Sequence, residues 1–160
     1  MYRKVLVPLD GSKTAECTFD HILAIATGCS VPEVDLIFVS EPPPPMESVP
    51  YERILAEMQN FRLRMKEYLD TAANNLKQKG VVSTKTVVTE GNAADTIIKY
   101  AADNGVDLIL MSTHGRSGPS RWAFGSVAEK VVRYSNVPVF IVAPRGCRLP
   151  VTWKNSNPAF

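Results

Sequence analysis

The sequence predicts a single α/β domain built on a doubly wound, five-stranded parallel sheet of the Rossmann-like type, in strand order 3-2-1-4-5. Its 160 residues suit one domain with a sizeable core. Short, β-branched apolar runs alternate with stretches in which apolar residues recur every three or four positions. This alternation indicates β-α units, in which right-handed crossovers join parallel strands and four helices cover the sheet.

The first strand and helix lie at the start of the chain. The run KVLVPLD, residues 4–10, is β-branched and ends at the turn signal Asp10-Gly11. Ser12 is a suitable N-cap for the helix that follows. The apolar face expected on that helix consists of Ala15, Phe19, Ile22 and Ala26.

The second strand and helix flank a run of prolines. The segment EVDLIFVS, residues 33–40, is apolar enough for a buried strand. The prolines from Pro42 to Pro45 then interrupt regular structure, and we interpret them as a stiff connector. A long helix is predicted over residues 51–79, ending at Gly80. Its expected apolar stripe consists of Ile54, Met58, Phe61, Met65, Tyr68, Leu69, Ala72 and Leu76.

The second half of the chain repeats the alternation. Residues 81–90 form the third predicted strand, and Gly91-Asn92 opens a helix after it. The segment DLILMS, residues 107–112, is apolar enough for a fourth strand that is buried on both faces. A fourth helical pattern contains Val127, Ala128, Val131 and Val132, and VPVFIV, residues 137–142, is the fifth strand. The predicted domain covers residues 1–143, and residues 144–160 form a proline-containing tail.

Composition limits the partners that the sequence predicts. The net charge of +2, without a long basic run, argues against nucleic acid. No apolar stretch reaches the length of about 18 residues that a membrane-spanning helix needs. Three cysteines without a C-x-x-C motif suggest neither a disulfide framework nor a zinc knuckle, and no metal-ligand spacing occurs. A cytoplasmic location is therefore expected.

A long connection after the fourth strand, STHGRSGPSRWAFGS, is the main candidate site. It exceeds the usual two to six residues of such turns, and a long loop at this end of a sheet is usually functional or disordered. Its glycines would let backbone N–H groups approach an anion, and it runs into a helix N-terminus. The P-loop pattern is absent. These features leave phosphate binding and a solvated connection both open.

The same residues resemble the universal stress protein family, from about Tyr2 to Pro144. The opening KVLVPLDGS is similar to the family's first strand, and STHGRSGPSRWAFGSVAEKVVRYSNVPVFIV is similar to its carboxyl-terminal signature. The signature of the ATP-binding branch is G-x2-G-x9-G-[ST]. Gly115, Gly125 and Ser126 match its later positions, whereas Ser112 replaces the first glycine.

The resemblance implies an adenine-nucleotide site at the ends of the strands. Asp10 matches the acidic residue that contacts the adenosine part, although capping of the next helix is its alternative role. Pro8 and Leu9 would line the adenine pocket, and the backbone of Val39 would meet the adenine edge. Met111 would pack on the base, or serve only as a buried strand residue.

The resemblance also implies a phosphate site around the long connection. Ser112 occupies the first glycine position, and a serine there would approach the phosphates less closely if the turn required a positive φ. A structural hydrogen-bonding role is the favoured alternative for His114. The residues implied here are Ser112, His114, Gly115, Arg116, Gly125, Ser126 and Val127. The implied ligand is ATP, with ADP or AMP as alternatives, and the presence of Mg²⁺ stays open.

A binding role is favoured over catalysis, because the sequence has neither paired carboxylates nor a nucleophile elbow that would mark an enzyme. No catalytic residue is assigned, and slow ATP hydrolysis remains an alternative. Family members commonly form homodimers through the last strand, which here begins at Val137 and ends at Val142. The resemblance therefore implies a homodimeric stress-response regulator, with a dimeric module that binds no nucleotide as the rival interpretation.

Overall fold

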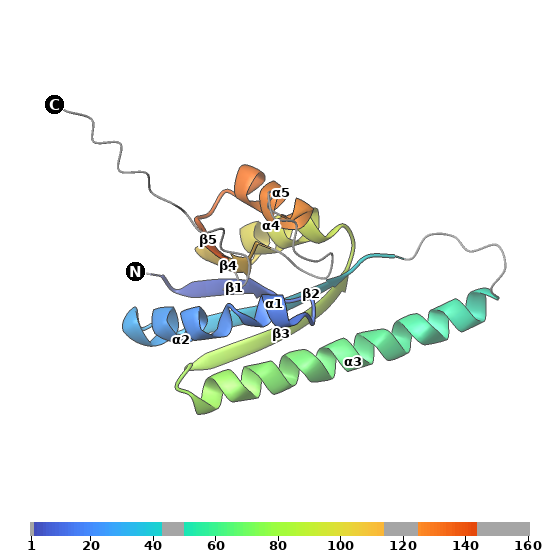
Figure 1. Ribbon diagram of the computed structural model, residues 1–160, viewed down its shortest axis with the longest axis horizontal. Coiled ribbons are helices and arrows are strands. Elements are labelled where there is room, and N and C mark those ends of the chain that lie inside the picture. The colour runs from blue at the N-terminus through green and yellow to red at the C-terminus, as the bar shows by residue number, and fades with distance from the viewer. Residues whose placement is uncertain (1, 43–49, 114–124, 144–160) are drawn as a thin grey trace, which may run out of the picture.

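Five parallel strands form one sheet in the computed structural model, in the order β3-β2-β1-β4-β5 (Figure 1). The structure describes residues 2–42, 50–113 and 125–143. The strands are β1 (Lys4–Pro8), β2 (Glu33–Ser40), β3 (Ser83–Glu90), β4 (Leu108–Ser112) and β5 (Val139–Val142). The predicted fold class and strand order are therefore confirmed. The order reverses between β1 and β4, which makes the ends of these two strands the expected ligand-binding position.

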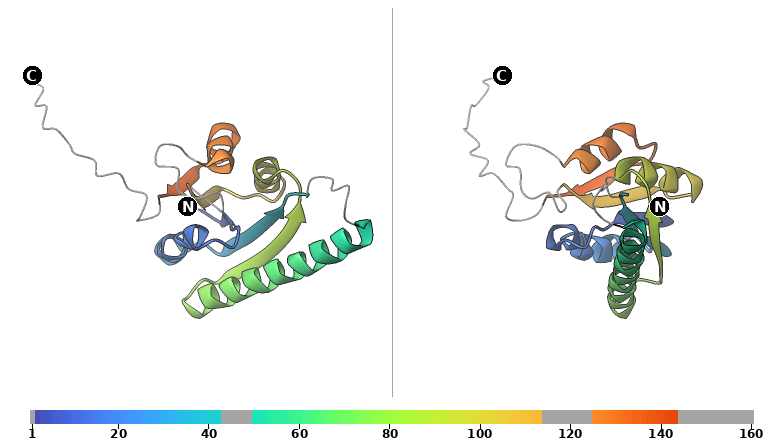
Figure 2. Two further views of the ribbon diagram at one scale, coloured as in Figure 1. Left: turned by 45° about the vertical axis from the view of Figure 1, so that its right-hand side comes forward. Right: turned by 90° about the vertical axis from the view of Figure 1, so that its right-hand side faces the viewer.

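The helices lie on both faces of the sheet (Figure 2). They are α1 (Lys13–Glu16), α2 (Phe19–Gly28), α3 (Tyr51–Gln78), α4 (Ala93–Asp103) and α5 (Ser126–Tyr134). The helix predicted after β1 is divided between α1 and α2. Between them, the buried Thr18 side chain donates from Oγ1 to the carbonyl oxygen of Ala15 at 2.7 Å. Such a side-chain bond competes with regular helical pairing, which explains the interruption.

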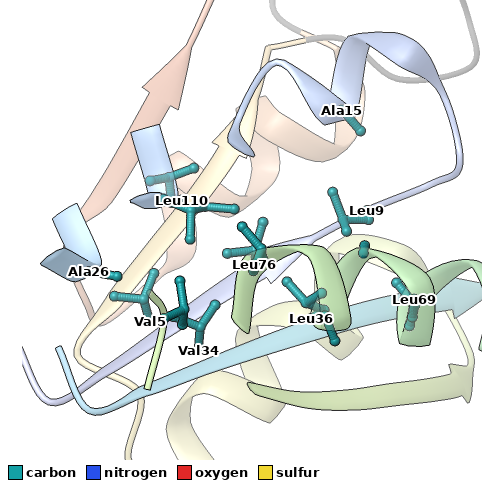
Figure 3. Packing of buried hydrophobic residues seen from close by; sticks show 14 of the residues in the cluster. Val5, Leu9, Ala15, Ala26, Val34, Leu36, Leu69, Leu76 and Leu110 are labelled. Atoms are coloured by element: carbon teal, nitrogen blue, oxygen red, sulfur yellow. The ribbon is translucent and has the colours of Figure 1, made fainter. Parts of the chain in front are cut away.

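Two hydrophobic clusters, one on each face, hold the helices on the sheet. One cluster joins alternate residues of the central strands to α1, α2 and α3, and Figure 3 shows Leu69 and Leu76 of α3 gathered with Leu36 of β2. The other cluster joins the intervening residues, such as Leu6 and Ile109, to α4 and α5. All five residues of β4 are buried, as its continuous apolar sequence predicts.

The long helix α3 extends past the sheet at its N-terminal end (Figure 1). Its 28 residues span about 42 Å, whereas the eight residues of β2 or β3 span about 26 Å. Leu69, Ala72 and Leu76 are buried as predicted, and Phe61, Met65 and Tyr68 pack at the margin of the core. Ile54 and Met58 are only half-buried. The apolar stripe therefore contacts the core along its C-terminal part alone.

Element ends differ from the predictions by two residues or fewer. β5 begins at Val139 rather than Val137, since Pro138 has no N–H to donate to a neighbouring strand. β3 begins at Ser83, because Val81 instead donates its N–H to Leu76 in the turn that ends α3. No helix within the described ranges is both long and apolar enough to span a bilayer.

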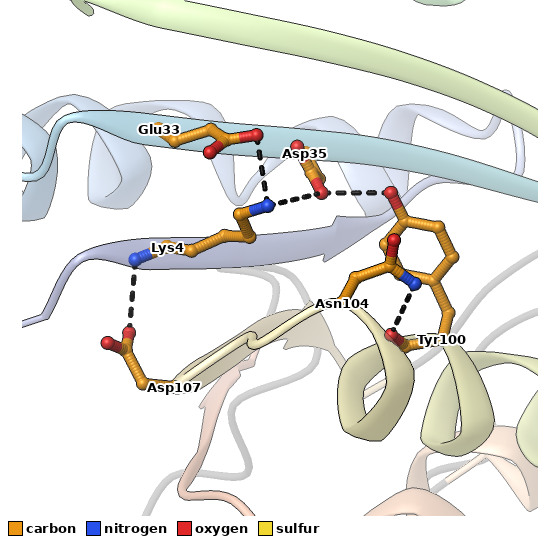
Figure 4. Close-up of polar contacts among 6 residues, drawn as sticks. All are labelled: Lys4, Glu33, Asp35, Tyr100, Asn104 and Asp107. Atoms are coloured by element: carbon orange, nitrogen blue, oxygen red, sulfur yellow. Dashed lines mark hydrogen bonds and ion pairs between the residues drawn. The ribbon is translucent and has the colours of Figure 1, made fainter.

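A polar cluster lies at the amino ends of the strands (Figure 4). Asp35 of β2 is fully buried, and its Oδ2 accepts a hydrogen bond of 2.9 Å from the Tyr100 hydroxyl. The Lys4 ammonium lies 3.9 Å from the same oxygen and 3.1 Å from Glu33 Oε1. Burial raises the pKa of Asp35, while Tyr100 and Lys4 act in the opposite direction. Asp107 accepts hydrogen bonds from the backbone N–H groups of Arg3 and Lys4, so it joins β1 to the start of β4.

Candidate functional site

A pocket of about 410 Å³ opens at the carboxyl ends of β1, β2 and β4, and we call it the carboxyl-edge pocket. It lies at the point where the strand order reverses, which is where open α/β sheets bind ligands. Its described lining consists of Pro8, Leu9, Asp10, Ala15, Ile37, Phe38, Val39, Ser40, Glu41, Phe61, Ala93, Ile97, Met111, Ser112, Thr113, Gly125, Ser126, Val127 and Ala128.

Most of the residues predicted for the site line this one pocket. They are Pro8, Leu9, Asp10, Val39, Met111, Ser112, Gly125, Ser126 and Val127. The other three predicted residues, His114, Gly115 and Arg116, lie outside the described residues. Residues that are far apart in the sequence thus meet because the carboxyl ends of parallel strands share one edge of the sheet.

Asp10 stands at the start of the turn between β1 and α1. Its Oδ1 accepts a hydrogen bond of 3.0 Å from the backbone N–H of Ser12 and one of 2.6 Å from the Ser12 hydroxyl. Ser12 Oγ in turn accepts from the N–H of Ala15 at 3.1 Å, so Ser12 is the N-cap of α1 as predicted. Gly11 has a φ of 80°, a conformation that favours glycine. Asp10 therefore acts on α1 through Ser12 and borders the pocket at the same time.

Ser112 ends strand β4 and is buried at 7% exposure. Ser30 is the sole described residue other than glycine that has a positive φ, so Ser112 is not in the left-handed region. The backbone at this position therefore does not require the glycine that the family signature has there. The serine replaces the glycine without backbone strain and adds a hydroxyl group to the pocket wall.

Two backbone hydrogen bonds close the base of the connection between β4 and α5. The Thr113 N–H donates to the carbonyl oxygen of Val142 at 3.1 Å, which joins this segment to β5. The Gly125 N–H donates to the carbonyl oxygen of Thr113 at 2.7 Å, which brings the two ends of the connection together. The start of α5 is thereby held beside the end of β4.

The N-terminus of α5 forms one wall of the pocket. Gly125 occupies the N-cap position, and Ser126 is the first helical residue. Gly125, Ser126 and Val127 all line the pocket. Because glycine has no side chain to cap the helix, the first N–H groups of α5 and the positive end of its dipole lie at a wall suited to an anion.

Sequence reasoning found Val39 at the end of β2 but missed its neighbours Ser40 and Glu41 and the start of α4. Ser40 and Glu41 line the pocket there together with Ala93 and Ile97. Glu41 Oε1 accepts a hydrogen bond of 3.4 Å from the Ala93 N–H, while Asn92 caps α4 by accepting from Asp95. The position of Glu41 could have identified it as a pocket residue, because it is a charged residue at the end of a buried strand that lies next to β1.

Phe61 is a second residue that the sequence did not single out for the site. It reaches the pocket from α3, and its ring meets that of Phe38 edge-on with centroids 5.7 Å apart. The Arg64 guanidinium lies 5.8 Å from the centroid of the Phe61 ring. The long helix therefore contributes an aromatic group to the apolar part of the pocket.

The charged groups of the described lining are carboxylates. Asp10 and Glu41 line the pocket, and no lysine, arginine or histidine does so among residues 2–42, 50–113 and 125–143. Within those same ranges, no three His, Cys, Asp or Glu side chains gather in a group that could hold a metal ion. The described wall therefore combines apolar surface, residues with hydroxyl groups, two carboxylates and the N-termini of α4 and α5.

Comparison with known proteins identifies a family. The model of the universal stress protein family matches residues 1–143. Universal stress protein MJ0577 of Methanocaldococcus jannaschii is 31% identical in a match that covers 89% of this chain and 95% of that protein. The solved structure of MJ0577 superposes with a TM-score of 0.78 at 32% identity, over 91% of this chain and 98% of the other.

Two more distant structures share the fold and contain nucleotides. A universal stress protein in complex with cAMP has a TM-score of 0.61 at 23% identity, and covers 89% of this chain and 97% of its own. A family member from Arabidopsis thaliana with AMP bound has a TM-score of 0.60 at 16% identity, over 93% and 97% of the two chains.

Proposed function

Since the chain belongs to the universal stress protein family, we propose that its carboxyl-edge pocket binds an adenine nucleotide, with ATP as the first candidate. The main support is the order of chemical groups along the sheet edge. Apolar surface lies at the end of β2, a carboxylate at the end of β1, and hydroxyl groups with a helix N-terminus at β4 and α5. This order matches the base, ribose and phosphates of a nucleotide.

The end of β2 suits a planar, largely apolar base. Ile37, Phe38 and Val39 line this part of the pocket, with Ile97 of α4 and Phe61 of α3 beside them. Small-molecule sites usually combine such apolar walls with a few placed polar groups. In our proposal, Pro8, Leu9 and Met111 contact the base as well, and the backbone of Val39 meets its polar edge.

Asp10 suits the ribose because it borders the middle of the pocket, at the end of β1 between β2 and β4. A carboxylate can accept hydrogen bonds from both hydroxyl groups of a ribose diol. Its hydrogen bonds from Ser12 hold the Asp10 side chain in place before a ligand arrives.

The start of α5 suits the phosphates. Ser112, Gly125 and Ser126 all line the pocket, and helix N–H groups and serine hydroxyl groups can donate to phosphate oxygens. His114, Gly115 and Arg116 belong to the proposed phosphate site through the family signature alone. The bound cAMP and AMP of the two distant relatives support an adenine nucleotide as the class of ligand. Which nucleotide this chain takes, and whether Mg²⁺ accompanies it, is for the binding experiment to decide.

We propose that the protein acts in the cytoplasm during a stress response. In this proposal, nucleotide binding regulates the protein and does not support rapid catalysis. The test is direct: the purified protein is denatured, and any released nucleotide is identified by chromatography. Calorimetric titration of nucleotide-free protein with ATP, ADP and AMP, with and without Mg²⁺, then ranks the ligands. An absence of released nucleotide together with an absence of binding at millimolar ATP would favour the interaction module without nucleotide. Steady release of ADP from ATP, abolished by Asp10→Ala, would favour the slow ATPase.

A homodimer through β5 is the second part of the proposal. Among the described residues β5 pairs with β4 alone, so its other edge is open to a further strand. Residues 137–143 contain no charged side chain, and Phe140 is 42% exposed. The opposite edge strand, β3, contains Lys85 and is tied to α3 by the Arg62–Glu90 ion pair. Charges and a covering helix protect an edge from pairing, so β5 is the edge suited to a second copy.

Sedimentation analysis tests the dimer. We expect the wild type to sediment as a dimer at micromolar concentrations and Phe140→Lys to sediment as a monomer. Val82→Lys is the matched control, because Val82 is 78% exposed and lies beside the other edge strand. A wild type that remains monomeric would contradict the proposal.

A further inference from the structure

Glu41 occupies the base end of the carboxyl-edge pocket. It directly follows β2 and lines the pocket together with Val39 and Ser40. Strand β2 is separated from β4 by β1, so Glu41 lies on the far side of Asp10 from the end of β4. Its carboxylate is therefore remote from the phosphate end and close to the apolar surface that suits the base.

The start of α4 holds the Glu41 side chain. Oε1 accepts a hydrogen bond of 3.4 Å from the N–H of Ala93, the first residue of α4. The positive end of a helix dipole favours an anionic side chain at this position. The Gly91 N–H also donates to the Ser40 carbonyl oxygen at 3.0 Å, which fixes the end of β2 against the turn before α4. The backbone before Glu41 is thus held beside the pocket, and the exposed carboxylate contacts the start of α4.

A carboxylate that faces position 6 of the base distinguishes purines by the substituent there. An ionised carboxylate only accepts hydrogen bonds. The 6-amino group of adenine can donate to it, whereas the 6-oxo oxygen of hypoxanthine or guanine is itself an acceptor. A polar group of the site that is left facing the wrong substituent lowers affinity more strongly than an apolar mismatch does.

We propose that Glu41 is a specificity-determining residue that selects 6-aminopurines over 6-oxopurines. This inference rests on the proposed function, because it places the base of a bound nucleotide at the end of β2. In the complex, the carboxylate accepts a hydrogen bond from the 6-amino group and retains its contact with the Ala93 N–H. Against a 6-oxopurine it meets the carbonyl oxygen and repels it.

The experiment compares ATP with inosine triphosphate, in which a 6-oxo group replaces the 6-amino group. Dissociation constants are measured by calorimetry for the wild type, Glu41→Gln and Glu41→Ala. Gln keeps an acceptor for the Ala93 N–H and adds an amide donor for the 6-oxo oxygen, so we expect the preference for ATP to fall by about tenfold. Ala removes both the attraction to the 6-amino group and the repulsion of the 6-oxo oxygen. We therefore expect Glu41→Ala to lower the preference for ATP by a smaller factor than Glu41→Gln does.

Glu90→Gln is the matched control. Glu90 ends the neighbouring strand β3 at the same edge of the sheet, pairs with Arg62 at 2.6 Å and is absent from the described lining of the pocket. The substitution removes the same charge, and the preference for ATP should not change. Melting temperatures of all variants establish that the fold is retained.

The outcomes separate this inference from the function beneath it. If the wild type binds both nucleotides and Glu41→Gln leaves their ratio unchanged, Glu41 serves only α4 and the inference is wrong while the proposed function stands. If the wild type binds neither nucleotide, the proposed function fails and the inference fails with it. If the preference for ATP over inosine triphosphate falls as much in Glu90→Gln as in Glu41→Gln, the inference is also wrong, because the loss of one negative charge would then explain both results.

Discussion

The two ends of the parallel sheet both contain charged and hydroxyl side chains, but these side chains face different surroundings. At the amino end, Lys4, Glu33, Asp35 and Tyr100 contact one another across β1, β2 and α4 (Figure 4). At the carboxyl end, Asp10, Glu41 and Ser112 border a pocket of about 410 Å³. Polar groups that pair with one another hold elements together, whereas polar groups around an open pocket are placed to meet a ligand.

The difference predicts two separable kinds of variant. Substitutions of the carboxylates that border the pocket should change ligand affinity more than the free energy of unfolding. Substitutions at the amino end should change the free energy of unfolding and leave affinity unaltered.

Asp10→Ala should weaken ATP binding by about 10- to 100-fold, because it removes a charged acceptor from the proposed ribose site. Calorimetric titration measures the loss. Asp10→Asn is the companion variant, since its amide oxygen can still accept from Ser12 and preserve the turn before α1. The charge-assisted bond is lost in both variants, so an affinity for Asp10→Asn equal to that of the wild type would contradict a ribose contact through the charge.

Tyr100→Phe should lower the free energy of unfolding by about 1 to 3 kcal/mol, because Asp35 Oδ2 loses its hydrogen-bond donor inside the protein. Asp35 Oδ1 already has no hydrogen-bond partner among the described residues, so little is available to compensate. Urea unfolding followed by circular dichroism measures the change. ATP affinity of the folded variant should equal that of the wild type, and a large loss of affinity would break the division between the two ends.

Asp35→Asn should change how stability depends on pH. Burial raises the pKa of Asp35 in the folded state above its ordinary value of about 3.8, so the folded state binds the proton more tightly than the unfolded state. Stability contributed by this group is therefore present at low pH and lost as pH rises through the folded pKa. Asn cannot ionise, so the stability of the variant relative to the wild type should increase upward from about pH 4.

Unfolding curves at several pH values between 4 and 7 test this dependence. Glu33→Gln is the control, because Glu33 also pairs with Lys4 but its carboxylate is partly exposed. A difference between Asp35→Asn and the wild type that stays constant over this range would mean that the Lys4 and Tyr100 contacts outweigh burial.

Local sequence patterns predict the buried elements of the sheet but not the polar contacts at its amino end. The burial of β4 on both faces and the core-facing side of α4 follow from local patterns, because β4 is apolar throughout and the core-facing positions of α4 recur at helical spacing. The Asp35–Tyr100 contact joins residues 65 positions apart, and only the packing of α4 on β2 brings them together. No local pattern contains that information.

The candidate site could be predicted only where its residues lie in turns that the sequence marks. Asp10, Ser112 and Gly125 lie in polar or glycine-containing turns, which are recognisable in a sequence. The sequence predicts Phe61 only as a core residue of the long helix. The spacing of apolar residues shows which face of α3 is buried, but it does not show whether a given residue on that face contacts the core or the pocket. The half-buried Ile54 and Met58 illustrate the same limit.

Ser112→Gly should have the smallest effect of the four changes. If the family glycine were needed for a left-handed backbone, restoring it would strengthen ATP binding markedly. Ser112 instead ends an extended strand without a positive φ, so we expect affinity to change by less than about threefold. Stability should fall by about 0.5 to 1 kcal/mol, because glycine in a strand loses more conformational entropy on folding. Calorimetry and urea unfolding measure the two quantities, and a tenfold gain in affinity would show that the serine obstructs the phosphates.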